Sequence, residues 1–150
     1  MIGLLQRVTG ARVQVHGIVV GEIGAGLLVL IGVQAGDTEL EADRLVDRIT
    51  RYRVFADTRD RMNLSLRDTG GGLLLVPQFT LAADTSRGLR ASFSGAAAPA
   101  EAEALFQRTV SRARELLRDR VSTGTFGADM QVQLTNDGPV TFWLEVPPSS

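Results

Sequence analysis

The stretch that most constrains this 150-residue chain lies near its C-terminus. Residues 136–141 read Asn-Asp-Gly-Pro-Val-Thr, between two apolar, alternating runs at 130–134 and 142–146. Runs of this kind, bounded by Asn, Asp, Gly and Pro, predict two strands joined by a tight connection. Glycine admits backbone angles closed to other residues, while proline fixes φ and has no N–H. The stretch therefore forms a rigid corner, either a structural turn or bare backbone pressed against a ligand.

The composition limits the available chemistry. The chain has no cysteine, which excludes disulfides, thiolate nucleophiles and cysteine-ligated zinc. Its one histidine, His16, lies in a predicted hairpin, and any Ser-His-Asp triad would have to use it. The net charge is −1, so no overall basic field indicates nucleic acid, although all 16 basic residues are Arg, which suits phosphate.

Length and hydropathy predict a single cytoplasmic domain. A chain of 150 residues with 44% hydrophobic and 22% charged residues is typical of one soluble globular domain. No apolar run approaches the ~20 residues that span a bilayer, and no signal-peptide core precedes the first strand. We expect one domain at 1–146 and a disordered tail at 147–150.

The order of elements predicts a mixed α/β fold. Residues 27–33 form a continuous apolar run, which predicts a central strand buried on both faces. Thr38 and Glu41 form a capping box for a helix to about Arg51, with Leu40, Leu45 and Ile49 inward. Pro99 begins a second helix that ends near Arg118. The remaining short strands are expected at 1–9, 11–15, 18–23, 52–55, 62–66 and 73–76.

Three arginines of the first helix, Arg44, Arg48 and Arg51, share one face. Asp43 and Asp47 are interleaved with them, so a solvated face is the main interpretation and phosphate binding is the lesser one.

A second stretch, Pro77-Gln78-Phe79-Thr80-Leu81, follows a buried strand, where α/β proteins often bind ligands. It is equally compatible with a core segment whose two polar residues face water. If it is a site, Thr80 has no evident base to activate it as a nucleophile. Such a pocket suits an easy reaction, such as hydrolysis of an activated ester with backbone N–H groups binding the oxyanion.

The two stretches together resemble the D-aminoacyl-tRNA deacylases (D-tyrosyl-tRNA deacylases). That family carries a Ser-Gln-Phe-Thr-Leu motif and an Asn-x-Gly-Pro-Val-Thr motif, which stand here at 77–81 and 136–141. The similarity runs from Met1 to Val146. The resemblance implies a three-layer α/β/β mixed-sheet fold, a homodimer, and no metal or organic cofactor.

The resemblance also implies roles for individual residues. Gly138 and Pro139 would enter the partner subunit's pocket and exclude L side chains. The peptide bond between them is cis in the family, although the sequence alone does not set the isomer. Thr80 and Gln78 are the expected catalytic residues, and together with Phe79 they would line the pocket for the 3′-terminal adenosine and the aminoacyl group. Phe79 and Pro77 are expected to bind the substrate. Phe126 and Met130 are expected on the adenine side, and Arg7 against the Gly-Pro corner. Catalysis rests either on Thr80 or on the 2′-hydroxyl of the substrate.

One residue departs from the motif. Pro77 stands where the family usually has Ser, and the related animal-type tRNA deacylases, which edit L-alanine, have Pro there. Phe79 and residues 136–141 match the D-specific group, so D-specificity is the expectation.

The sequence thus predicts an editing hydrolase that cleaves the ester of D-aminoacyl-tRNA, and of glycyl-tRNA(Ala), to free amino acid and tRNA. Two other functions stay open: a non-catalytic module that binds the RNA end, and a metabolic esterase for small activated esters.

Overall fold

A computed structural model describes residues 1–149. Its strands are β1 (Ile2–Val15), β2 (Ile18–Ile23), β3 (Gly26–Gly32), β4 (Phe55–Ala56), β5 (Met62–Leu64), β6 (Gly72–Pro77), β7 (Val121–Thr123) and β8 (Gln131–Glu145). Its helices are α1 (Glu39–Arg51), α2 (Leu66–Thr69), η1 (Phe79–Ala82), α3 (Pro99–Leu117) and η2 (Arg118–Arg120).

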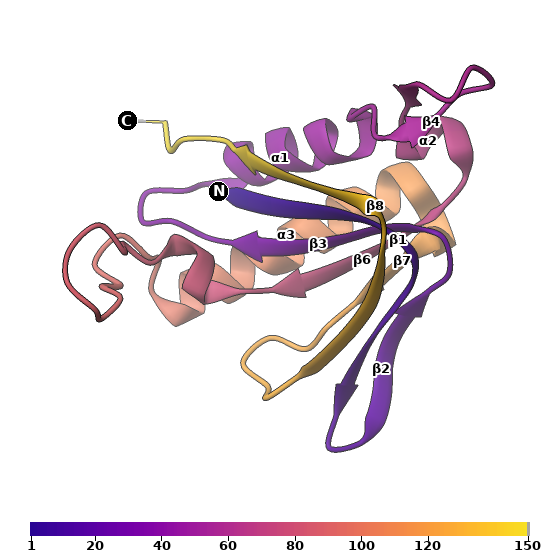
Figure 1. Ribbon diagram of the computed structural model, residues 1–150. Helices are drawn as coiled ribbons and strands as arrows, with labels where there is room; N and C mark the ends of the chain where they lie inside the picture. The colour runs from indigo at the N-terminus through magenta and orange to yellow at the C-terminus, as the bar shows by residue number, and fades with distance from the viewer. Residues whose placement is uncertain (150) are drawn as a thin grey trace.

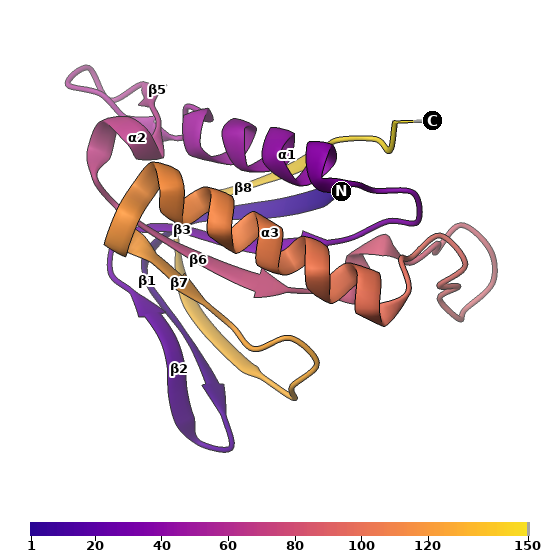
Figure 2. The same ribbon diagram turned by 180° about the vertical axis from the view of Figure 1, so that it is seen from behind.

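A mixed sheet in the order β2-β1-β3-β6-β7 is the centre of the molecule, with β8 also pairing with β1. The pairs β3–β6 and β6–β7 are parallel, and each needs a crossover connection, which α1 and α3 provide. These two helices lie side by side on one face of the sheet (Figures 1 and 2). The predicted mixed α/β single-domain class is confirmed, and β3 is the buried central strand that its apolar run predicts.

Apolar side chains are buried on both faces of the sheet. The larger core lies under the helices and includes Leu45, Ile49 and Phe106. A smaller core on the other face contains Val8 and Val13 of β1, Leu28 of β3, and Leu74 and Val76 of β6. The distal part of β1, with β2 and the first part of β8, bends away from the helices to enclose it (Figure 1). The three-layer description and the homodimer stay predictions.

Helix α1 begins where the sequence predicts. The Thr38 hydroxyl accepts from the Leu40 N–H at 3.3 Å, and the Glu41 carboxylate accepts from the Thr38 N–H at 2.6 Å, so the capping box is formed. Leu45 and Ile49 are fully buried, as expected. The inward placement of Leu40 is wrong: it is 48% exposed, because the buried stripe of the helix runs through Ala42 and Val46 instead.

The connection at residues 136–141 is not a hairpin turn. Both apolar runs belong to one strand, β8, and both pair antiparallel with β1, from Gln131 opposite Gln14 to Glu145 opposite Ile2. The register between β1 and β8 shifts around Arg7, because residues 137–140 have no paired residue on β1 and form a bulge. The prediction of two strands joined by a tight turn is therefore wrong, since a local pattern of turn residues does not show that both flanks have the same partner strand.

Three smaller elements also differ from expectation. The strand predicted at 52–55 covers only Phe55 and Ala56, which pair with β5. The short helices α2 and η1 have no apolar periodicity long enough to reveal them. The limits of the domain and tail stay a prediction: residues 147–149 are described, Ser149 donates to Glu41 at 2.6 Å, and Ser150 lies outside the described residues.

Within residues 1–149, no helix is both long and apolar enough to span a membrane.

Candidate functional site

A cavity of about 800 Å³ opens where the end of β6, the start of α3 and the segment before β8 meet. It brings together five of the residues that the sequence singles out: Pro77, Gln78, Phe79, Phe126 and Met130. Thr80, the other expected catalytic residue, does not line the cavity. Much of its remaining wall consists of small residues, at 96–98, 102 and 127–128. A mostly apolar cavity with a few polar groups at one end is typical of a small-molecule or nucleotide-end site.

Strand β6 delivers the polar end of the cavity. Pro77 lies opposite Ile31 in the parallel register, and the Gln78 N–H donates to the Ile31 carbonyl at 2.8 Å, which extends the ladder by one residue. The chain then turns into η1, whose first internal bond joins the Leu81 N–H to the Gln78 carbonyl at 3.2 Å. The N–H groups at the start of such a helix, here those of Phe79 and Thr80, have no partner within the helix.

Thr80 has no base beside it in the described chain. Its hydroxyl accepts a hydrogen bond from the Gln78 side-chain amide, and among residues 1–149 no histidine or carboxylate bonds to it. His16 is remote from this role, at the exposed tip between β1 and β2 with φ of +50°. The nearest carboxylate in sequence, Asp84, bonds instead to Ser86, which holds its pKa below the usual 3.8.

An exposed aromatic pair stands at the rim of the cavity. Phe79 is 63% exposed, which contradicts its interpretation as a core residue, and its ring lies 5.3 Å from that of Phe93. Exposed aromatic faces of this kind bind nucleic acid bases by stacking. Sequence reasoning missed Phe93, because the long irregular connection at 83–98 gives no periodicity from which its partner could be inferred.

The opposite wall depends on Met130 and Phe126. The Thr125 N–H points to the Met130 sulfur at 3.4 Å, and Gly124 leaves room for that sulfur, since a Cβ on Gly124 would lie 2.9 Å from it. Phe126 packs 6.4 Å, ring to ring, from the buried Phe106. This wall is therefore connected to the main core and has a defined shape.

The Gly138–Pro139 corner lies on the bulge of β8, and its peptide bond is cis. Asn136 closes the bulge: its side-chain oxygen accepts from the Val140 N–H at 3.0 Å, and its amide donates to the Thr141 hydroxyl at 2.9 Å. Neither Gly138 nor Pro139 lines the 800 Å³ cavity of the same chain. The two predicted halves of the site are therefore not brought together within one chain.

Arg7 holds the bulge from the neighbouring strand. Its Nε donates to the Asp137 carbonyl at 3.1 Å, and its Nη1 donates to the Val54 carbonyl at 2.7 Å. The side chain is 17% exposed and lies 3.6 Å from the Asp137 carboxylate. Arg7 thus contacts the corner residue preceding Gly138, and it does not line the cavity.

Comparison with known proteins gives consistent matches along the whole chain. A family profile described as D-Tyr-tRNA(Tyr) deacylase matches residues 4–145. A protein of Alkalilimnicola ehrlichii named D-aminoacyl-tRNA deacylase is 63% identical over 100% of this chain and 99% of its own length.

Two solved structures have the same fold. One, described as a c-Myc DNA unwinding element binding protein, superposes with a TM-score of 0.94 at 37% identity and covers 98% of this chain and 99% of that one. Another, described as a probable eukaryotic D-amino acid tRNA deacylase, has a TM-score of 0.85 at 19% identity, with 97% and 98% coverage.

Proposed function

The chain belongs to the D-Tyr-tRNA(Tyr) deacylase family, and on this basis we propose that it is a D-aminoacyl-tRNA deacylase, an enzyme that hydrolyses the ester between a D-amino acid and tRNA. The observation that carries the proposal is the 63% identity with a relative of that name over the full chain. Hydrolysis releases the free D-amino acid and an uncharged tRNA, and the expected location is the cytoplasm.

The cavity takes the 3′ end of the tRNA in this proposal. Phe79, exposed beside Phe93, stacks on the terminal adenine, and Phe126 and Met130 close the adenine side. The aminoacyl ester lies against Pro77 and Gln78, and Gln78 is the polar side chain among the residues that line the cavity. The free N–H groups at the start of η1 then bind the oxyanion that forms as water attacks the ester.

A hydroxyl of the substrate takes the place of a protein base. Thr80 accepts a bond from Gln78 and contacts no group within the described residues that could take its proton. The 2′-hydroxyl of the terminal ribose lies next to the ester, orients the attacking water and relays a proton from that water to the 3′-oxygen as the ester bond breaks. Gln78 and Thr80 therefore act by positioning the ester and its oxyanion, and the low barrier of an activated ester makes this sufficient.

Chiral selection is assigned to Gly138 and Pro139 acting across a homodimer. Their corner is presented on a bulge but lines no part of its own chain's cavity, which fits insertion into the cavity of a second copy. Backbone carbonyls near the substrate α-carbon leave space for hydrogen but not for an L side chain. A D-amino acid or glycine passes this filter, so glycyl-tRNA(Ala) is a second substrate.

Deacylation of four charged tRNAs tests the proposal: D-tyrosyl, glycyl, L-tyrosyl and L-alanyl. The expected result is cleavage of the first two, with both L-substrates spared. Cleavage of L-alanyl-tRNA would show that Pro77 changes specificity. Binding without any cleavage would favour the RNA-end binding module, and cleavage of small esters without dependence on tRNA would favour the metabolic esterase.

A further inference from the structure

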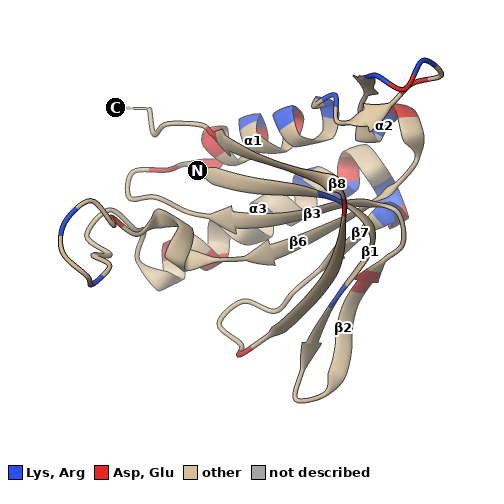
Figure 3. Ribbon diagram, viewed as in Figure 1, with Lys and Arg blue, Asp and Glu red and all other residues tan. Residues whose placement is uncertain are grey.

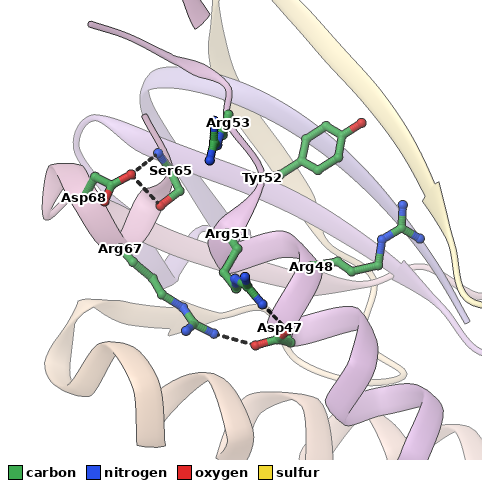
Figure 4. Close-up of a pocket in the computed structure, with 8 residues that line it drawn as sticks. All are labelled: Asp47, Arg48, Arg51, Tyr52, Arg53, Ser65, Arg67 and Asp68. Atoms are coloured by element: carbon green, nitrogen blue, oxygen red, sulfur yellow. Dashed lines mark hydrogen bonds and ion pairs between the residues drawn. The ribbon is translucent and has the colours of Figure 1, made fainter. Parts of the chain in front are cut away.

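A second pocket, distinct from the cavity, is lined by four arginines. It has a volume of about 440 Å³ and lies at the C-terminal end of α1, beside α2 (Figure 4). The arginines are Arg48, Arg51, Arg53 and Arg67, and the pocket also contains Asp47, Tyr52, Ser65 and Asp68. We call it the arginine pocket.

The carboxylates of the arginine pocket are already engaged. The Asp47 carboxylate forms ion pairs with Arg67 at 2.8 Å and with Arg51 at 3.3 Å. Partial burial of Asp47 raises its pKa, but the bonds to these two arginines outweigh that effect and hold the pKa below 3.8. Asp68 accepts from the backbone N–H and hydroxyl of Ser65 at 2.8 and 3.0 Å, which lowers its pKa as well. Both carboxylates are therefore ionised at neutral pH and hold fixed partners.

Two arginines remain without an ion pair, although the charge of Arg53 contributes to the lowered pKa of Asp68. Within residues 1–149, neither Arg48 nor Arg53 forms an ion pair; Arg48 donates to the Glu145 carbonyl at 3.0 Å and Arg53 to the Asn63 side chain at 3.3 Å. Both side chains belong to exposed residues. Each guanidinium has five N–H donors, so most of its donors stay free for an anion.

The arginine pocket is linked to the Gly138–Pro139 corner through Arg7. Arg53 precedes Val54, whose carbonyl accepts from Arg7 at 2.7 Å, and the same Arg7 bonds to Asp137 at 3.1 Å. On the other side, the ring of Tyr52 lies 5.6 Å from that of Phe142 on β8, in a T-shaped contact. Segment 52–54 thus connects the arginines to the corner by way of Arg7.

We propose that the arginine pocket of one copy binds backbone phosphates of a tRNA acceptor stem, while the 3′ end of that tRNA lies in the cavity of the second copy, which the corner of the first copy enters. The proposal rests on the proposed function, because it places the RNA by the position of its ester. Arginine binds phosphate through paired N–H donors. The chain has a net charge of −1, so attraction to RNA must come from a local group such as this one (Figure 3).

The test compares two substrates of the full-length enzyme. One is D-tyrosyl-tRNA, and the other is D-tyrosyl-adenosine, which carries the same ester without stem phosphates. In Arg48→Gln/Arg53→Gln, kcat/KM for the tRNA is expected to fall by about tenfold or more, through KM. Turnover of D-tyrosyl-adenosine stays unchanged. In the same double variant, the logarithm of the association constant for uncharged tRNA depends less steeply on the logarithm of the salt concentration, with a slope shallower by roughly 1.4 to 2.

Three variants separate phosphate binding from structure. Arg114→Gln on α3 removes an exposed charge that does not line the pocket and is expected to leave both substrates unchanged. Asn63→Ala removes the partner of Arg53 but no charge, and is expected to keep the wild-type salt slope. Arg53→Lys, alone, keeps the charge and most of the slope.

The outcomes distinguish this inference from the proposed function. If the wild type cleaves D-tyrosyl-tRNA and the double variant matches it in KM and salt slope, the arginine pocket is not an RNA site. The same conclusion holds if Asn63→Ala reproduces the defect. If the wild type cleaves neither substrate, the proposed function itself fails.

Discussion

Arg7 on β1 donates from Nε to the carbonyl oxygen of Asp137 on β8 at 3.1 Å, although 130 positions separate the two residues. The bond fixes the first residue of the bulge that presents Gly138 and Pro139. Because Arg7 also donates to the Val54 carbonyl, the bulge is anchored to the segment after α1 as well as to its partner strand.

Replacing Arg7 should loosen chiral selection more than stability. In Arg7→Ala, the Asp137 and Val54 carbonyls lose their donor, which costs about 1–2 kcal/mol in a partly exposed site. The bulge then moves more freely, and the ratio of D-tyrosyl-tRNA to L-tyrosyl-tRNA cleavage is expected to fall by about tenfold. Single-turnover rates on both substrates measure this ratio.

Arg12→Ala is the matched control for Arg7. Arg12 lies on the same strand, is exposed and bonds to the Gln133 side chain at 2.6 Å, away from the bulge. Its removal should leave the D-to-L ratio at the wild-type value. An unchanged ratio in Arg7→Ala, with the variant folded, would refute a role of Arg7 in selection.

Gly138 tolerates no side chain in its present conformation. Its φ is +128°, and an added Cβ would lie 2.7 Å from Val140 Cγ2 and 3.1 Å from Arg7 Nη2. Gly138→Ala is therefore expected to cost roughly 1–3 kcal/mol of strain at the bulge and to displace the corner. Cleavage of D-tyrosyl-tRNA should fall sharply, and the melting temperature should fall by about 2–4 °C for each kcal/mol of this strain.

Gly17→Ala gives the comparison for Gly138. Gly17 also has a positive φ, +77°, but a Cβ there meets nothing within 4 Å. It should show the backbone cost without loss of activity. Equal losses of activity in the two variants would mean that the displaced corner is not responsible.

Thr80 is expected to assist turnover without being the nucleophile. Its hydroxyl contributes one hydrogen bond beside Gln78, so Thr80→Ala should slow D-tyrosyl-tRNA cleavage by about tenfold at most. As a second test, D-tyrosyl-tRNA without the 2′-hydroxyl of the terminal ribose should be cleaved far more slowly by the wild type. Both rates come from single-turnover assays with saturating enzyme.

The opposite pattern would restore Thr80 as the nucleophile. Complete loss of cleavage in a folded Thr80→Ala, together with normal cleavage of the 2′-deoxy substrate, is the result that would require an acyl-enzyme. Thr80→Ser, which keeps a hydroxyl, serves as the control and should retain most of the wild-type rate.

Glu41 makes the fold sensitive to acid. Hydrogen bonds from Ser149 and Thr38 lower the pKa of Glu41 from 4.5 to about 2. Because the folded pKa lies below the unfolded one, the ionised carboxylate stabilises the fold above pH 4.5. This contribution is lost as the pH falls from 4.5 to about 2.

Melting temperatures of the wild type and Glu41→Gln between about pH 2 and pH 7 measure this contribution. Glu41→Gln should be less stable at neutral pH and should lose less stability on acidification. Ser149→Ala, which keeps the carboxylate but removes one donor, should lie between the two. Parallel curves for all three proteins would show that Glu41 does not cause the acid sensitivity.

Local signals predicted the elements whose causes are local. The capping box at Thr38 gave the start of α1, and Pro99 gave the start of α3, because both act within one helical turn. The sequence did not predict the bulge at residues 137–140, because its shape depends on β1, more than 120 positions away. The pairing of Phe79 with Phe93 is a contact between an end of β6 and a long loop, and no periodicity reports it.

The site was predictable only as separate parts for a related reason. Pro77 to Thr80 and Gly138 to Pro139 could be named from motifs, and five predicted residues do meet in one cavity. That the corner lies outside this cavity follows from the register of β8 on β1, which no local pattern contains. Completing the site with a second copy of the chain remains part of the proposal.

Gly124 offers a way to alter the cavity without touching the substrate residues. A Cβ at this position would lie 2.9 Å from Met130 Sδ, whose flexible side chain can yield toward the cavity. Gly124→Ala should therefore raise KM for D-tyrosyl-tRNA with a smaller change in kcat. Gly95→Ala, where the nearest atom is the Ala82 carbonyl oxygen at 3.9 Å, should leave both parameters unchanged. The double variant Gly124→Ala/Met130→Ala is compared with Met130→Ala alone. Equal KM values in these two variants would show that the Gly124→Ala defect comes from displacement of Met130, whereas a higher KM in the double variant would show that it has another cause.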